Sequence, residues 1–138
     1  MWTSDVRYLL DTNIVSVLVR DPHGAVTERI RAVGEANVCT SIIVTAELRY
    51  GAAKKASARL LAQLERVLSA LDVLPFESPA DASYGDARAQ LERAGTPIGG
   101  NDLLIAAQAI AGGYTLVTDD QREFERVPNL QIENWLRN

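Results

Sequence analysis

Short apolar runs alternate along the chain with longer segments in which apolar residues recur every three or four positions. The apolar runs predict strands at residues 6–10, 37–40, 73–76, 115–118 and 130–132. Helical spacing predicts helices at 14–20, 26–33, 42–55, 60–71, 82–94 and 101–111, and a helical turn at 122–125. This order predicts an α/β fold, with a central, mostly parallel sheet of four to five strands covered by helices on both faces.

Length and composition predict one domain that spans residues 1–138 and has an aliphatic core. Hydrophobic residues make up 47% of the chain and aromatic residues only 6%. No signal-peptide pattern and no apolar run near the ~20 residues of a membrane span is present, so we expect a cytoplasmic protein with no membrane partner. The net charge of −4 has the wrong sign for a nucleic-acid binder unless basic residues cluster locally or the acids gather around a metal.

The single cysteine and the single histidine exclude several kinds of catalysis. Cys39 lies in a predicted strand, where a small core residue is expected, and it has no partner for an internal disulfide. His23 lies in the predicted turn at 21–24, so a pair of imidazoles acting as acid and base is not available. No Gly-x-Ser-x-Gly elbow and no P-loop occurs. Hydrolysis by a metal-activated water remains open.

Several acidic residues lie where a solubilising charge is not expected. Asp11 follows the first predicted strand, and Asp119 and Asp120 follow the strand at 115–118. Glu47 shares the apolar face of its helix, and Asp102 opens the most apolar helix. Each also has an ordinary explanation: a helix cap for Asp11, an ion pair with an arginine for Glu47, a favourable first-turn charge for Asp102 and a turn for the Asp pair.

Taken together, these acids predict a metal site. The carboxyl ends of parallel strands meet at one edge of the sheet, so side chains far apart in the sequence can converge there. Several carboxylates brought that close repel one another unless a divalent cation lies among them. Oxygen ligands without nearby cysteine or histidine favour Mg²⁺, with Mn²⁺ as an alternative.

Four segments resemble, in order and spacing, the acidic motifs of PIN-domain ribonucleases. They are Leu9–Asn13, Ala46–Leu48, Pro97–Ala107 and Leu116–Asp120. Over nearly its whole length the chain is similar to the VapC toxins of VapBC toxin–antitoxin pairs. The tail, with Arg122–Leu130 and Glu133–Trp135, resembles the branch that cuts initiator tRNA in its anticodon loop.

This resemblance implies a PIN-like α/β/α fold and roles for individual residues. Asp11, Glu47 and Asp102 would be catalytic, metal-site carboxylates. The fourth acid would be Asp120, with Asp119 and Glu123 as alternatives. Thr12, Asn13 and Thr118 would orient ligands or waters around the metal. The resemblance also implies a homodimer and a cognate VapB-type antitoxin whose C-terminal segment lies across the active site and inhibits it.

Contacts to RNA would have to come from local basic residues. The candidates lie on or after the helix at 42–55 and near the fourth acid, and they are Arg49, Lys54, Lys55, Arg59, Arg122 and Arg126. Each of them would equally suit a solvated helix face. Trp135 suits either base stacking or a place in the core.

The leading hypothesis is a toxin that acts as an Mg²⁺-dependent endoribonuclease on RNA, with tRNA as the expected substrate, and leaves 5′-phosphate and 3′-hydroxyl ends. A structure-specific DNA nuclease would share the same acidic site. A phosphoacceptor domain would need a lysine after a late strand, and residues 115–121 contain none. A haloacid-type phosphatase would need an acid where Asn13 stands, and a non-catalytic binding module would not need the full set of acids.

Overall fold

A sheet of five parallel strands runs through the centre of the protein, and the computed structural model describes residues 6–137. The strands are β1 (Tyr8–Leu10), β2 (Val38–Ser41), β3 (Asp72–Leu74), β4 (Thr115–Val117) and β5 (Gln131–Glu133). Their spatial order is β3-β2-β1-β4-β5, and every neighbouring pair is parallel. The predicted parallel sheet is therefore confirmed.

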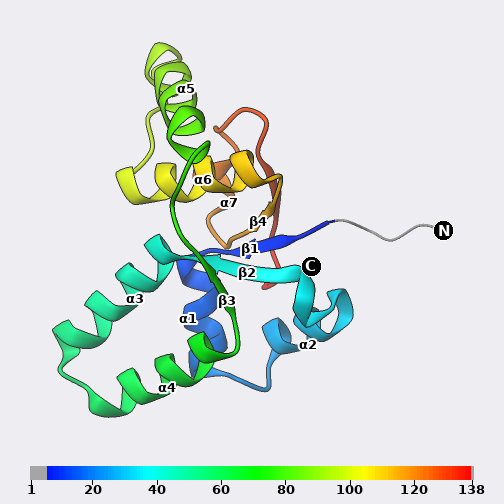
Figure 1. The fold of residues 1–138 in the computed structure, drawn as a ribbon, viewed down its shortest axis with the longest axis vertical. Helices are drawn as coiled ribbons and strands as arrows, with labels where there is room; N and C mark the ends of the chain where they lie inside the picture. The colour runs from blue at the N-terminus through cyan, green and yellow to red at the C-terminus, as the bar shows by residue number, and fades with distance from the viewer. Residues whose placement is uncertain (1–5, 138) are drawn as a thin grey trace.

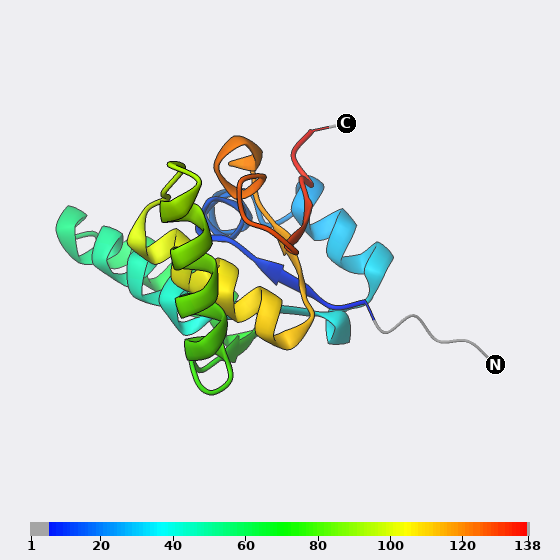
Figure 2. The same cartoon turned by 90° about the horizontal axis from the view of Figure 1, so that it is seen from above.

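Helices cover both faces of this sheet. They are α1 (Thr12–Arg20), α2 (Ala25–Val33), α3 (Ile42–Lys55), α4 (Ala58–Ser69), α5 (Ala80–Arg93), α6 (Gly100–Gly112) and α7 (Gln121–Phe124), and a 3-10 turn η1 (Glu35–Asn37) precedes β2. Helices α1 to α4 lie on one face and α5 to α7 on the other, as Figure 1 shows. Seen from above, α5 crosses α6 on the outside (Figure 2). The predicted three-layer α/β/α arrangement is confirmed.

Helix α6 is the buried helix that its sequence predicts. Leu103 is 4% exposed and Ile105 and Ala106 are fully buried, because the sheet packs on one side of the helix and α5 on the other. Gly113 caps its C-terminal end, and the φ of 70° at Gly113 is the left-handed conformation that glycine adopts without strain. Cys39 and Trp135 are also buried, so both are core residues.

Several element boundaries differ from the predicted ones because side-chain caps define them. Helix α1 begins at Thr12, since the carboxylate of Asp11 accepts a hydrogen bond from the Thr12 amide. Helix α4 begins at Ala58, after Ser57 caps it by accepting from the Leu60 amide. Strand β1 begins only at Tyr8, and the preceding Val6 is 43% exposed.

The connections along the chain diverge between β1 and β4. From β1 the chain moves outward through β2 to β3, crosses the sheet by way of α5 and α6, and returns as β4 beside β1 before it moves to β5. In open α/β sheets, ligands bind at the carboxyl ends of the strands at such a switch point. Asp11 and Thr118 directly follow the two strands that meet there.

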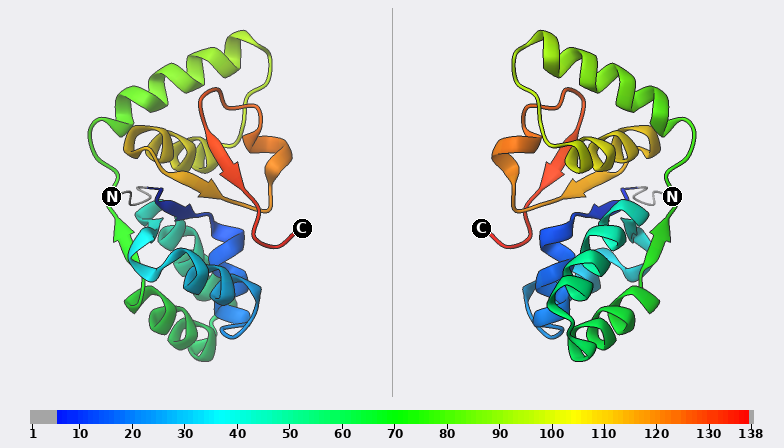
Figure 3. Two further views of the ribbon diagram at one scale, coloured as in Figure 1. Left: turned by 90° about the vertical axis from the view of Figure 1, so that its right-hand side faces the viewer. Right: turned by 90° about the vertical axis from the view of Figure 1, so that its left-hand side faces the viewer.

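The C-terminal segment continues from β5 toward α1 and α2 (Figure 3). Trp135 lies against Tyr8 with a ring-centroid distance of 5.4 Å. Within residues 6–137, no helix is both long and apolar enough to cross a bilayer.

Candidate metal and catalytic site

Asp11 lies at the switch point, with only 3% of its surface exposed. One carboxylate oxygen, Oδ1, accepts from the Thr12 amide at 2.8 Å, and Oδ2 accepts from the Thr118 hydroxyl at 2.8 Å. Asp11 is thus both the helix cap considered from the sequence and a carboxylate held in one orientation at the end of β1.

Glu47 reaches the same region from α3. Its Oε1 accepts from the Thr12 hydroxyl at 2.6 Å, and its Oε2 accepts from the side-chain Nδ2 of Asn101 at 3.4 Å. Within residues 6–137, Glu47 forms no ion pair with an arginine or lysine. The alternative explanation of its position, an internal ion pair, is therefore wrong.

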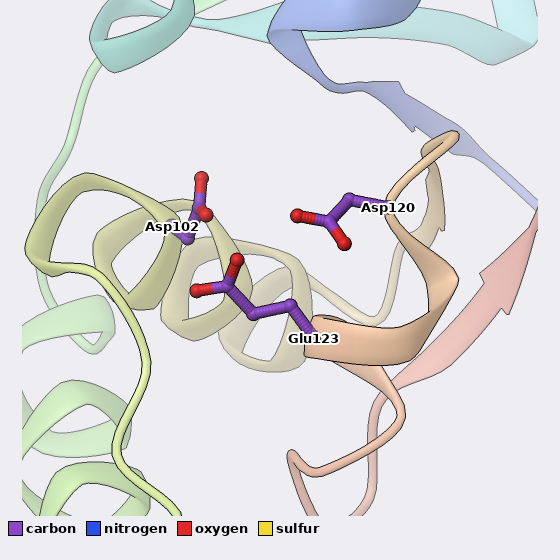
Figure 4. Close-up of side chains that lie close together, drawn as sticks. All are labelled: Asp102, Asp120 and Glu123. Carbon is purple, nitrogen blue, oxygen red and sulfur yellow. The ribbon is translucent and has the colours of Figure 1, made fainter.

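Three further acids form a cluster near Asp11 and Glu47. Asp102 comes from the first turn of α6, Asp120 from the loop after β4 and Glu123 from α7 (Figure 4). Each offers one carboxylate oxygen, and these oxygens lie within 4.8 Å of one another. Glu123 is held in place by the Gly99 amide, which donates to its Oε1 at 2.9 Å.

Burial and mutual repulsion raise the pKa values of three acids in this group. Burial raises the pKa of Asp11 to about 6, against the opposing hydrogen bonds from Thr118 and Thr12. Burial, then repulsion from Asp11 and Glu123, raises the pKa of Asp102 to about 7. The pKa of Asp120 is also raised, chiefly by burial. Glu123 differs, because the hydrogen bond from the Gly99 amide lowers its pKa.

These residues fit a divalent cation. The donors are carboxylate oxygens only, and neither Cys39 nor His23 is among them. Burial first, and neighbouring acids second, raise the pKa values of Asp11 and Asp102, so a cation at this place would stabilise their ionised forms. Oxygen-only donor sets suit hard cations such as Mg²⁺ and Mn²⁺.

Asp119 does not join the group, although the sequence made it a candidate for the fourth acid. Its Oδ1 accepts from Asn134 at 2.9 Å and from Arg137 at 3.0 Å. These two hydrogen bonds, that from Asn134 foremost, lower the pKa of Asp119. The structure instead brings both Asp120 and Glu123 to Asp102.

The small polar residues named from the sequence connect the strand ends. The Thr118 hydroxyl, which donates to Asp11, also accepts from the Asp120 amide at 3.0 Å. Asn13 accepts from the Asp119 amide at 3.1 Å. No sequence pattern marks Asn101 or Asn134 as a site residue, although Asn101 directly precedes Asp102 in the chain.

The candidate RNA-binding residues fall into two groups. Arg49 forms an ion pair with Glu65, and Lys54 lies 6.0 Å from the centre of the Tyr50 ring. Near the acids, Arg126 donates to the Pro97 carbonyl at 3.4 Å. The remaining candidates are exposed, and they are Lys55, Arg59 and Arg122.

Comparisons with known proteins agree with this architecture. The PIN domain family model matches residues 8–130. Over 130 residues the chain is 40% identical to Ribonuclease VapC2 of Rickettsia felis, covering 93% of this chain and 97% of that protein. It is 38% identical over 131 residues to the tRNA(fMet)-specific endonuclease VapC of Salmonella typhimurium, covering 94% and 98%.

A solved structure gives the same result in three dimensions. The crystal structure of VapBC2 from Rickettsia felis bound to a promoter DNA fragment contains a chain that matches with a TM-score of 0.88 and 38% identity. The match covers 94% of this chain and 99% of that one. Sequence and fold agree over nearly the full length, and the chain therefore belongs to the PIN domain family, together with the VapC ribonucleases.

Proposed function

We propose that this protein is the toxin of a VapBC-type pair and a Mg²⁺-dependent endoribonuclease. The observation that carries the proposal is the convergence of five acids at the switch point of the sheet: Asp11, Glu47, Asp102, Asp120 and Glu123. The names of its relatives, which are ribonucleases and endonucleases, support the reaction class.

In this proposal, different residues bind the cation and orient the neighbouring acids. Asp102, Asp120 and Glu123 would hold the cation together with the neighbouring Asp11, and Thr12 and Asn101 orient Glu47 beside them. A divalent cation in such a site lowers the pKa of water and offsets the charge that develops on phosphate. Water oxygen bonds to phosphorus, the bond to the 3′ oxygen breaks, and that oxygen takes the proton, which leaves 5′-phosphate and 3′-hydroxyl ends.

RNA cleavage by the Asp102→Asn variant tests whether the reaction depends on this acid. We expect the purified variant to remain folded and to lose cleavage of a tRNA mixture in Mg²⁺ or Mn²⁺ by at least a hundredfold. Asp86→Asn, the same change at an exposed position of α5, should cut like the unaltered protein. Undiminished cutting by Asp102→Asn would contradict the assignment, and preference for branched DNA over tRNA would favour the DNA nuclease.

The substrate proposed is initiator tRNA, cut in the anticodon loop. Relatives at 38% and 37% identity, from Salmonella typhimurium and Shigella flexneri, are named tRNA(fMet)-specific endonucleases and support this choice. Mapping of new 5′ ends after induced expression should show one cut in one tRNA loop. Cuts scattered over messenger RNA would contradict the substrate but not the reaction class.

The proposed partner is a VapB-type antitoxin, which would bind a homodimer of this toxin. Matching solved structures are VapBC complexes. A groove of about 210 Å³ between α1, α3 and α4 also runs up to Glu47, with Leu48, Leu60 and Leu64 in its wall. An antitoxin segment seated there would reach the acids.

Two experiments test these partners. Leu48→Arg should weaken co-purification with the antitoxin and leave RNA cleavage intact. Light scattering of the free toxin should give twice the monomer mass.

A further inference from the structure

Among residues 6–137, two side chains accept hydrogen bonds from the main-chain amides of the loop that carries Asp120. The Asp119 amide donates to Asn13 at 3.1 Å, and the Asp120 amide donates to Thr118 at 3.0 Å. The helix that follows, α7, spans only Gln121–Phe124, too few residues to set its own direction by internal hydrogen bonds. The buried Phe124 and the Gly99 amide, which donates to Glu123, fix the far side of this segment, so the placement of Asp120 depends on what else holds residues 119–121.

The Asp119 side chain provides a further attachment, to the C-terminal segment. Its Oδ1 accepts from Asn134 at 2.9 Å and from Arg137 at 3.0 Å. The same Asn134 amide group donates to Gln121 at 3.3 Å, at the first residue of α7. Asn134 thus contacts the residues on both sides of Asp120.

The C-terminal segment is itself firmly packed. Trp135 is 4% exposed, packs against Tyr8 with the two rings tilted by 53°, and donates to Glu133 at 3.0 Å. Arg29 of α2 pairs with Glu133 at 3.7 Å and lies 5.7 Å from the centre of the Trp135 ring. Asn134 also accepts from the Leu136 amide at 2.9 Å, which sets its own orientation. A loop that is hydrogen-bonded to this segment is therefore connected to the core.

We propose that Asp119, Asn134 and Arg137 form a C-terminal clamp that positions Asp120 for the cation. This inference rests on the proposed function and assigns Asp119 to positioning instead of metal binding. With its carboxylate occupied by Asn134 and Arg137, Asp119 holds the loop without adding its charge to the acid group. Asn134 is the principal member, since the Arg137 side chain is 70% exposed and an exposed ion pair contributes little.

Substitutions at Asp119 separate a clamp from a ligand. In Asp119→Asn the side-chain oxygen can still accept from Asn134 and Arg137, but the negative charge that a cation needs is gone. Asp119→Ala removes both the accepting oxygen and the negative charge. A clamp predicts Mn²⁺ affinity within about threefold of the unaltered protein for Asp119→Asn and a loss of about tenfold for Asp119→Ala. A ligand would lose affinity in both variants.

Asn134→Ala tests the clamp from the other side, because Asn134 is no ligand candidate. We expect a loss of Mn²⁺ affinity of about tenfold by isothermal titration calorimetry. Asp119→Ala combined with Asn134→Ala should lose hardly more than either alone, because both break the same attachment. Arg31→Ala, which breaks the exposed pair with Glu28, is the control and should bind Mn²⁺ normally.

Hydrogen exchange tests the clamp independently of any cation. In Asn134→Ala, the amides of residues 118–125 should exchange faster by at least tenfold, while those of the distant α4 stay unchanged. Faster exchange with no Mn²⁺ binding even by the unaltered protein would keep the clamp and overturn the proposed function. Unchanged exchange in residues 118–125, or equal Mn²⁺ losses in Asp119→Asn and Asp119→Ala, would overturn the clamp.

Discussion

The Thr118 hydroxyl donates a hydrogen bond of 2.8 Å to Oδ2 of Asp11, across 107 residues of sequence. It links the carboxyl ends of β4 and β1, the two strands between which the chain connections diverge. Because the same hydroxyl accepts from the Asp120 amide, one buried threonine orients an acid on each strand end. The geometry of the acid group thus depends on a residue that carries no charge.

Thr118→Val should reduce both stability and RNA cleavage, although it hardly changes the volume of the side chain. Valine keeps the shape but leaves Asp11 Oδ2 and the Asp120 amide without their partner, at a cost of about 1–3 kcal/mol. We expect a lower melting temperature and a ten- to hundredfold loss of RNA cleavage. Thr118→Ser keeps the hydroxyl and should retain most of the activity; equal losses in the two variants would mean that the methyl group, and not the hydrogen bond, matters.

Asp102→Asn should stabilise the protein when no metal is present. The pKa of about 7 shows that burial and the neighbouring acids oppose a charge at Asp102, and an amide removes that opposition. In EDTA at pH 8 we expect the melting temperature to rise by ~2–5 °C, whereas Asp86→Asn should leave it unchanged. A lower melting temperature for Asp102→Asn would show that the ionised carboxylate is not under electrostatic strain.

The stability of the metal-free protein should fall as pH rises from about 4 to about 7. Asp11 and Asp102 have folded-state pKa values of about 6 and about 7, above the ordinary value of 3.8. In this window the folded state holds protons that the unfolded state has released, so raising the pH favours unfolding. Melting curves in EDTA at several pH values measure the effect.

A bound cation should reverse this trend, since it competes with those protons. With saturating Mn²⁺ the melting temperature should hold or rise over the same pH range. Asp11→Asn combined with Asp102→Asn should show neither the fall in EDTA nor the gain with Mn²⁺. A metal-free protein whose stability increases from pH 5 to pH 7 would contradict the prediction.

Glu123→Gln tests whether Glu123 contributes charge or only a hydrogen bond. Its oxygen can still accept from the Gly99 amide, so we expect an unchanged melting temperature. Mn²⁺ affinity measured by calorimetry should fall about tenfold, as it should for Asp120→Asn. If Glu123→Gln binds Mn²⁺ normally while Asp120→Asn does not, Asp120 alone is the fourth acid.

The basic residues should differ in their importance for RNA binding. Arg49 is already paired with Glu65, whereas Lys55 and Arg122 are exposed and can reach a phosphate. Each true phosphate contact that is lost should lower the slope of log affinity against log salt by about 0.7. We expect this for Lys55→Ala and Arg122→Ala and less for Arg49→Ala, measured by filter binding with the inactive Asp102→Asn protein.

Periodicity along the chain was enough to predict the layers of the fold. Each helix and strand buries an apolar face, and the spacing of that face is written locally, as in α6 with Leu103, Ile105 and Ala106. Exact boundaries were less predictable, because they depend on single capping contacts such as those of Asp11 and Ser57. The position of Glu47 among apolar neighbours was a valid signal, since a charge on such a face needs a partner from elsewhere.

The sequence by itself determined which acids are out of place, since an unpaired carboxylate among apolar residues has a local energetic cost wherever the chain leads. Only the tertiary structure decided their roles relative to one another. Asp119 and Asp120 are adjacent and chemically identical, yet one faces Asn134 and Arg137 while the other faces Asp102 and Glu123. Side-chain direction in a loop depends on partners brought together by β5 and α6, and no local pattern encodes those distances.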